Sequence, residues 1–177
     1  MLRVDFYILP DATPEGRFLY ACRLIEKAHG LGHPIYLHTP SASVARRMDS
    51  LLWTYRKNSF LPHGLTEDAL LPVPPILIGD DRGPEVMGTP LDEILVRMHS
   101  LLCPITNVPP WEGPSAPGAV LINLASSVPS FFDRFTRVAE LVDQEEQNLR
   151  AGRMRFTYYR ERNISPESHK LPPNIPR

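Results

Sequence analysis

Residues 3–38 read RVDFYILPDATPEGRFLYACRLIEKAHGLGHPIYLH, and this stretch decides the fold because it alternates between strand and helix patterns. Val4–Leu9 has the aromatic and β-branched content of a strand. Thr13 then caps a predicted helix over Pro14–His29, which has proline at its first position and apolar residues at helical spacing. A second short strand follows at Pro34–His38. Two strands joined through a helix are expected to be parallel, so this stretch predicts one α/β unit.

The same alternation continues along the chain. Ser41 caps a second amphipathic helix, whose apolar face includes Met48 and Leu52. Ala119–Leu124 is a near-continuous apolar run, typical of a strand at the centre of a sheet. The remaining expected elements are a short strand at Ile76–Ile78, a short helix around Phe131–Phe135, a strand at Arg137–Val142 and a last helix over Asp143–Arg162. The sequence therefore predicts an α/β fold with a largely parallel central sheet.

A single α/β domain is expected over residues 1–164, because a chain of 177 residues can bury one sizeable core. The chain has 20 prolines against 10 glycines, and residues 80–118 are rich in both. We interpret residues 80–118 as an insertion with its own helix at Leu91–Leu102. Residues 165–177 contain several prolines and are predicted to be an extended or disordered tail.

The composition argues against several classes of protein. Apolar residues make up 42% and charged residues 22% of the chain, and the formal net charge is -1. No overall attraction to nucleic acid or to a membrane is expected at that charge. Cys22 and Cys103 are too few for a disulfide framework or a zinc site. A strand-like segment begins at Arg3, and no apolar run approaches the roughly 20 residues of a membrane span, so we expect a cytoplasmic protein.

The sequence lacks the usual motifs for catalysis and cofactor binding. The turn at residues 10–16 has no GxGxxG motif and no P-loop lysine, and its prolines lack amide donors. There is no GxSxG elbow for a serine nucleophile, and His29, His33 and His38 have no cysteine or carboxylate partners at metal-ligand spacing. We therefore expect no catalytic residue, cofactor or metal. The alternative is a small α/β hydrolase or transferase that uses His63 or His38 as a base.

Arginines are concentrated in the last third of the chain. They are Arg134, Arg137, Arg150, Arg153, Arg155, Arg160 and Arg162. Arg150 and Arg153 share a face of the last predicted helix, and Val142 could provide an apolar floor beside them. Two guanidiniums beside an apolar pocket suit an acidic peptide with a terminal carboxylate and an aromatic ring. The spacing alone favours a plainer interpretation, a solvated helix face whose arginines pair with Glu145 and Glu146.

Bulky side chains surround the turn after the second helix. Trp53 ends that helix, two cations follow, and the run Phe60, Leu61, Pro62 and His63 comes next. Aromatic residues near exposed cations are typical of protein-binding surfaces, so these five residues are candidates for binding a partner protein. The alternative is that Trp53 and Phe60 only close the core, and that His63 bonds a loop carbonyl.

Taken together, these segments resemble the chi subunit family of the bacterial DNA polymerase III holoenzyme. Four stretches carry the resemblance across most of the chain, in the correct order. They are Val4–Leu9, Leu51–Leu65 with its Leu-Trp…Phe-Leu-Pro-His pattern, Val120–Leu124 with Phe135–Val142, and the arginine-rich helix through Phe156, Tyr159 and Arg160.

The resemblance implies a three-layer α/β/α Rossmann-like domain without nucleotide binding. It also implies a non-catalytic accessory subunit with two protein partners and only indirect contact with nucleic acid. One partner is the psi subunit, which ties chi to the clamp loader, and the other is the acidic, phenylalanine-ended C-terminal tail of single-stranded DNA-binding protein.

The resemblance also implies roles for particular residues. Trp53 and Phe60 match the family's aromatic docking surface, assigned to psi. Arg153 matches the basic anchor for the tail, and Val142 matches its apolar neighbour. The family's second basic residue aligns with Leu149, next to Arg150. Residues 80–118 are longer than the equivalent family region.

Overall fold

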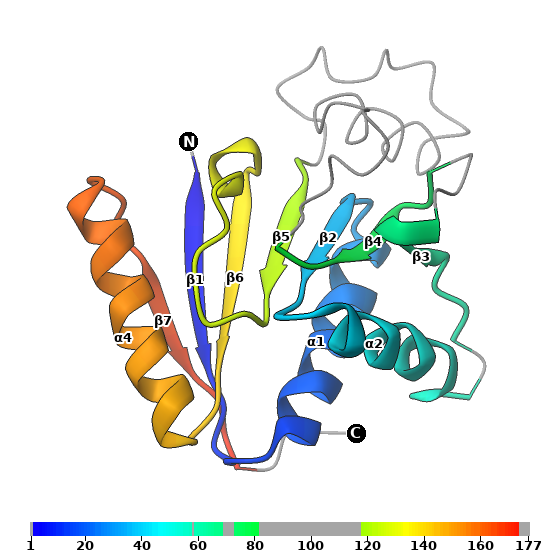
Figure 1. The fold of residues 1–177 in the computed structure, drawn as a ribbon, viewed down its shortest axis with the longest axis horizontal. Coiled ribbons are helices and arrows are strands. Elements are labelled where there is room, and N and C mark those ends of the chain that lie inside the picture. Colours follow the sequence, from blue (N-terminus) through cyan, green and yellow to red (C-terminus); the bar gives the residue numbers. More distant parts are fainter. Residues whose placement is uncertain (1, 58, 69–72, 82–117, 174–177) are drawn as a thin grey trace.

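The structure is a computed structural model, and it describes residues 2–57, 59–68, 73–81 and 118–173 (Figure 1). Its centre is a seven-stranded sheet in the order β3-β4-β2-β5-β6-β1-β7, and every neighbouring pair is parallel. The strands are β1 (Arg3–Ile8), β2 (Ile35–His38), β3 (His63–Leu65), β4 (Ile76–Gly79), β5 (Val120–Asn123), β6 (Arg137–Val142) and β7 (Glu167–Lys170). The helices are α1 (Pro14–Gly30), α2 (Ala42–Thr54) and α4 (Glu146–Glu161), with short 3-10 turns η1 (Thr66–Asp68) and η2 (Phe132–Arg134).

Helices cover both faces of the sheet, which gives three layers. Helices α1 and α2 lie on one face, and α4 lies on the other, over the end of the sheet that contains β6, β1 and β7 (Figure 1). Each layer has its own core: Ile25 and Met48 pack with Ile122 on the first face, while Phe6 and Tyr159 pack together on the second. The prediction of a three-layer α/β/α fold with a parallel sheet is therefore confirmed.

The helix caps explain why the first two helices begin as predicted. Thr13 Oγ1 accepts a hydrogen bond from the Gly16 amide at 3.2 Å, and Ser41 Oγ accepts one from the Val44 amide at 3.3 Å. The last helix begins at Glu146, three residues later than the prediction. Asp143 is buried ahead of it, and its carboxylate accepts a bond from the Glu145 amide at 3.1 Å. Among the described helices, none combines the length and apolar character needed to cross a bilayer.

Two strands were not predicted. The three residues of β3 pair with β4 at one edge of the sheet. At the other edge, β7 pairs with β1 in register from Asp5 opposite Glu167 to Ile8 opposite Lys170. Part of the segment expected to be an extended or disordered tail therefore extends the sheet by one strand. The helix expected at Leu91–Leu102 and most of the expected insertion lie outside the described residues.

A buried polar cluster joins α4 to the sheet. Glu140 on β6 is fully buried, and its carboxylate lies 2.7 Å from Arg155 Nε on α4. The Tyr159 hydroxyl donates to the same carboxylate at 2.7 Å, and the Asn123 amide donates to it at 3.1 and 3.2 Å. Burial, and then the nearby Glu140 charge, raise the pKa of Tyr159, so this phenol stays protonated and remains a donor. Arg155 is thus an internal residue, in contrast to the surface arginines nearby.

Candidate protein-binding sites

A cavity of about 250 Å³ lies between α4 and strands β1, β6 and β7. It is called the α4 cavity below. Its lining residues are Phe6, Ile8, Val142, Leu149, Gly152, Arg153, Phe156 and Ser168. Two of the residues that the sequence analysis singled out, Val142 and Arg153, are therefore brought to one site. The site combines an apolar wall with one exposed guanidinium.

Gly152 allows α4 to approach the sheet closely at this cavity. A Cβ atom added there would lie 3.0 and 3.1 Å from the two methyl groups of Val142, which is tighter than ordinary contact. Glycine inside a helix costs about 1 kcal/mol relative to alanine, so its position in the middle of α4 indicates a packing need. Val142 was expected to be the floor of this site, and Gly152 was a further signal in the sequence that could have placed α4 against it.

The two candidate arginines are separated by the structure. Arg153 lines the α4 cavity, whereas Arg150 is not among the lining residues. Arg150 instead pairs with Glu146 one helical turn earlier, and both side chains are exposed. The plainer interpretation, a solvated ion pair on a helix face, therefore describes Arg150. Leu149, the position aligned with the family's second basic residue, contributes apolar surface to the cavity.

Other lining residues were missed by the sequence analysis. Phe6 and Ile8 were recognised only as strand residues, and Ser168 belongs to the unpredicted strand β7. Phe156 packs edge-to-face on Phe6, with ring centroids 5.3 Å apart, and so fixes one wall of the cavity.

The second candidate surface is centred on two exposed aromatic side chains. Trp53 is 56% exposed and Phe60 is 72% exposed, and their ring centroids lie 5.8 Å apart. The His63 ring supports Trp53 from beneath, at 4.9 Å between centroids. Large apolar side chains that remain this exposed suggest a surface that another protein covers. Trp53 and Phe60 are called the aromatic surface below.

Three further residues proposed for this surface are placed differently. Leu61 is buried in the core beneath α1 and α2, and Pro62 is half-buried. The His63 side chain is fully buried, with Nδ1 2.5 Å from the Leu61 carbonyl oxygen and Nε2 3.2 Å from the Asp49 carbonyl oxygen. Of the five predicted residues, Trp53 and Phe60 are exposed, Pro62 is half-buried, and Leu61 and His63 are buried. The last two are buried because the chain enters the sheet here as strand β3.

The structure also bears on the alternative of histidine-based catalysis. The His38 and His63 side chains are both fully buried, so neither can reach a substrate in this conformation. His38 Nε2 lies 3.0 Å from Asp81 Oδ1, and its ring packs edge-to-face on Phe131 at 5.7 Å between centroids. Burial lowers the pKa of His38 below its ordinary value of 6.5, despite the opposing influence of Asp81.

This lowered pKa of His38 predicts a loss of stability in mild acid. The unfolded chain binds a proton at this histidine more readily than the folded chain, so the free energy of unfolding should fall as the pH drops below about 6.5. Urea unfolding at pH 7.0 and 5.5 should show a larger loss for the wild type than for H38Q. Equal losses in the two proteins would show that His38 does not contribute to the acid sensitivity.

Comparison with known proteins identifies the family of the chain. Residues 1–167 match the family described as DNA polymerase III chi subunit, HolC. DNA polymerase III subunit chi of Pseudomonas aeruginosa is 34% identical over 172 residues, which cover 97% of this chain and 99% of that protein. Because both matches span nearly the whole chain, we conclude that it belongs to the DNA polymerase III chi subunit family.

Proposed function

We propose that this accessory subunit links the clamp loader to single-stranded DNA-binding protein in the bacterial cytoplasm. It binds psi through the aromatic surface and the acidic C-terminal tail of single-stranded DNA-binding protein through the α4 cavity. The observation that carries the proposal is the combination of Arg153 with an apolar wall in the α4 cavity. Contact with DNA is made through the binding protein, in keeping with a net charge of -1.

The α4 cavity suits a peptide that ends in phenylalanine. The terminal carboxylate would pair with the Arg153 guanidinium, in a charge-assisted hydrogen bond. The terminal ring would pack against Val142 and Phe156, which both line the cavity. At a chain end the α-carboxylate and the aromatic ring belong to the same residue, so a site that holds both groups close together favours a terminal phenylalanine.

The two proposed sites are well separated, which supports a bridging role. The α4 cavity lies on the face of the sheet that α4 covers, near the β7 edge. Trp53 lies at the end of α2, on the opposite face, and the strand that follows Phe60 is β3 at the other edge (Figure 1). Both partners can therefore bind at once without contacting each other's residues.

Replacing Arg153 by alanine should weaken binding of the tail about tenfold or more. A hydrogen bond to a charged group contributes about 1.5–3 kcal/mol, and each 1.4 kcal/mol corresponds to about a tenfold change in affinity. The measurement is an isothermal titration at low salt with a peptide ending in Asp-Ile-Pro-Phe. Arg150→Ala is the matched control, because Arg150 lies on the same helix but pairs with Glu146 outside the cavity.

A peptide with an amidated C-terminus distinguishes the contribution of the terminal carboxylate to binding from that of the aromatic ring. It should bind the wild type and Arg153→Ala with equal affinity, because the group that pairs with Arg153 is gone. If Arg150→Ala weakens binding more than Arg153→Ala, the tail lies outside the α4 cavity. If the unmodified peptide does not bind the wild type at low salt, the assignment of the tail to this protein fails.

A further inference from the structure

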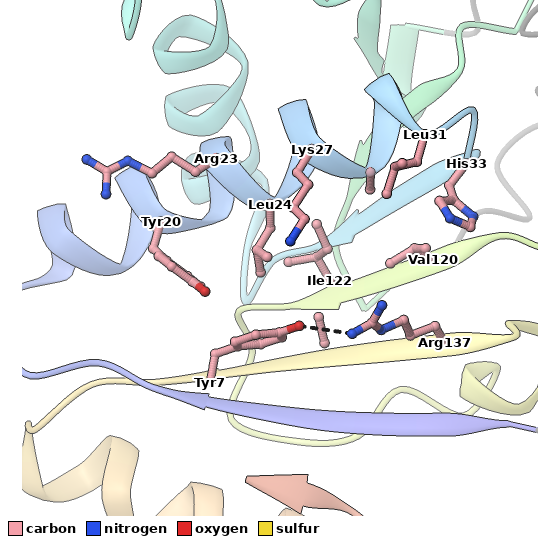
Figure 2. Close-up of a pocket in the computed structure, with 12 residues that line it drawn as sticks. Tyr7, Tyr20, Arg23, Leu24, Lys27, Leu31, His33, Val120, Ile122 and Arg137 are labelled. Atoms are coloured by element: carbon pink, nitrogen blue, oxygen red, sulfur yellow. Dashed lines mark hydrogen bonds between the residues drawn. The ribbon is translucent and has the colours of Figure 1, made fainter. Parts of the chain in front are cut away.

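A second cavity, of about 240 Å³, lies on the opposite face of the sheet from α4 (Figure 2). It is called the α1 cavity below, because α1 forms its roof and strands β1, β5 and β6 form its floor. Its lining residues are Tyr7, Tyr20, Arg23, Leu24, Lys27, Ala28, Leu31, His33, Val120, Ile122, Arg137 and Ala139. None of the residues that the proposed function uses lines it.

The lining of the α1 cavity is basic. Arg23, Lys27, His33 and Arg137 all contribute to it, and no aspartate or glutamate does so among the described residues. The Lys27 ammonium points from α1 toward the sheet, while the Arg23 guanidinium points away (Figure 2). A negatively charged group that enters the cavity would therefore lie between Lys27 and Arg137, and Lys27 would supply most of the attraction because Asp5 partly balances the Arg137 charge.

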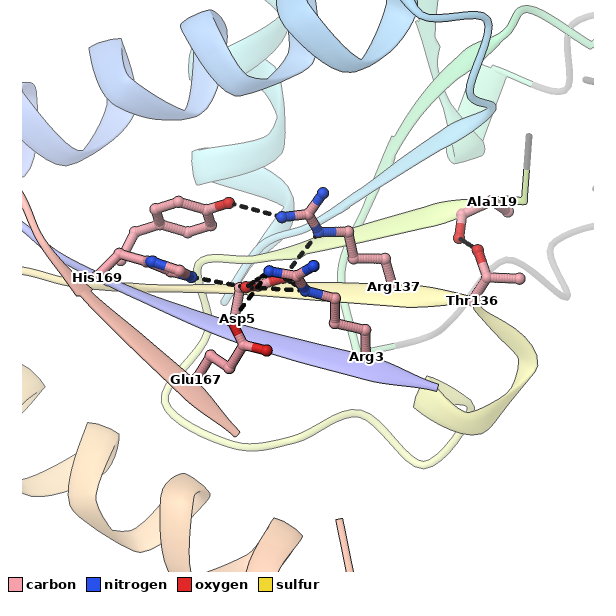
Figure 3. Close-up of polar contacts among 8 residues, drawn as sticks. Arg3, Asp5, Ala119, Thr136, Arg137, Glu167 and His169 are labelled. Carbon is pink, nitrogen blue, oxygen red and sulfur yellow. Dashed lines mark hydrogen bonds and ion pairs between the residues drawn. The ribbon is translucent and has the colours of Figure 1, made fainter. Parts of the chain in front are cut away.

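The Arg137 guanidinium is held in place on the floor. Its Nε donates to Asp5 Oδ2 at 2.8 Å (Figure 3), and its Nη2 donates to the Tyr7 hydroxyl at 3.1 Å (Figure 2). Asp5 is fully buried and also binds Arg3 and His169. Burial alone would raise the pKa of Asp5, but these hydrogen bonds outweigh it and lower that pKa, so the anchoring carboxylate stays charged. The guanidinium is thus oriented before any ligand arrives.

Aromatic and apolar groups form the rest of the cavity. The Tyr7 and Tyr20 rings lie 5.7 Å apart and are tilted by 49°, and the Tyr20 hydroxyl points into the cavity (Figure 2). Burial raises the pKa of Tyr20 to about 12, so its phenol is neutral and can donate a hydrogen bond at physiological pH. Leu24, Val120 and Ile122 provide apolar contacts.

We propose that the α1 cavity binds a small flat anion, an aromatic ring that carries one phosphate or carboxylate group. The ring lies against the tyrosines and the apolar floor, and the anionic group lies between Lys27 and Arg137. The volume of the cavity limits the ligand to about one ring system with its charged substituent, since cavities for drug-sized ligands start at roughly 300 Å³. Cations beside oriented aromatic rings favour this class over neutral or cationic ligands.

Isothermal titration with two probes identifies the anionic group. Phenyl phosphate carries a phosphate on a single aromatic ring, and phenylacetate carries a carboxylate on a single aromatic ring. At least one probe should bind, and the probe with the higher affinity shows whether phosphate or carboxylate is the preferred anion. Phenol and inorganic phosphate, which each lack one half of the ligand, should bind at least about tenfold more weakly than the tighter probe. Failure of both probes to bind would overturn the proposal.

Point variants test whether the probe binds in the α1 cavity. Lys27→Glu should weaken binding at least about tenfold, because it replaces an attractive charge by a repulsive one on an exposed side chain that does not support the fold. Lys57→Glu makes the same charge change at an exposed lysine outside the cavity and should leave binding unchanged. Equal affinities in Lys27→Glu and Lys57→Glu would refute the site. A loss of binding in Arg153→Ala would refute it too, because that variant alters only the α4 cavity.

Discussion

Replacing Arg155 by methionine (R155M) should lower the free energy of unfolding by about 3–5 kcal/mol, because it leaves a buried charge without its partner. Arg155 is 4% exposed and Glu140 is fully buried, so water cannot take over the lost interaction. The Arg155 Nη1 also donates to the Ser126 carbonyl oxygen at 3.2 Å, and this bond would be lost as well. Urea unfolding at pH 7 measures the change.

Two controls test whether the loss of stability comes from the unpaired buried charge or from the removal of an arginine in general. Arg153→Met makes the same substitution two residues away on an exposed side chain and should change stability by less than about 0.5 kcal/mol. The double variant E140Q/R155M removes both charges and should recover part of the loss, because a neutral amide is less costly to bury than an unpaired carboxylate. A decrease of less than about 1 kcal/mol in the free energy of unfolding of R155M would contradict a buried ion pair that water does not reach.

The same substitution bears on the α4 cavity. Arg155 and Tyr159 hold α4 on Glu140, and Gly152 on the same helix forms part of the cavity floor. Loosening this attachment should weaken tail binding in R155M even though Arg155 is not among the lining residues. Arg153→Met, in contrast, should weaken tail binding while stability stays constant. The pair of variants therefore distinguishes support of the cavity from direct contact with the ligand.

The fold was predictable where a strand is buried on both faces. Strands β2 and β5 are fully buried, so their runs of apolar residues stand out from the sequence. Strand β7 has the sequence ESHK and is mostly exposed, so no apolar pattern marks it. It forms because Glu167 and His169 meet Arg3 and Asp5 across the sheet. Contacts between residues so far apart in the chain are invisible to a local pattern.

The candidate sites could be predicted only in part, because a residue's position on a helix gives only a rough direction for its side chain. Val142 and Arg153 meet at one cavity, but Arg150 points elsewhere, since three residues of separation on a helix still leave a rotation of roughly 60° between side chains. Arg155 looks like its neighbours in the sequence and is nevertheless buried. Its partners, the Glu140 carboxylate and the Ser126 carbonyl oxygen, are distant in the chain, so composition alone could not separate structural arginines from binding arginines.

Replacing Trp53 by alanine should weaken binding of psi at least about thirtyfold. A central aromatic residue of an interface commonly contributes 2 kcal/mol or more, and 1.4 kcal/mol corresponds to about tenfold. Trp53 is 56% exposed in the free chain, so the substitution should leave the fold largely intact. The measurement is a titration of purified psi, together with the yield of psi that copurifies with each variant.

The matched control is Met154→Ala, which removes another large apolar side chain, 73% exposed, from α4 on the other face of the sheet. It should leave psi binding unchanged, and Trp53→Ala should leave tail binding unchanged, because the two sites share no residue. Wild-type recovery of psi by Trp53→Ala would remove the aromatic surface from the proposal.

A substitution at His63 tests whether the residue beneath Trp53 is needed to hold the aromatic surface in place. Its ring packs under Trp53 and its two nitrogens lie close to backbone carbonyl oxygens, so His63→Ala should release Trp53 from its fixed orientation. An ordered aromatic side chain binds more tightly than a mobile one, because less conformational entropy is lost on binding. His63→Ala should therefore weaken psi binding by less than Trp53→Ala does, and the double variant should be no weaker than Trp53→Ala alone. Additive losses would instead mean that His63 contacts psi directly, which its full burial argues against.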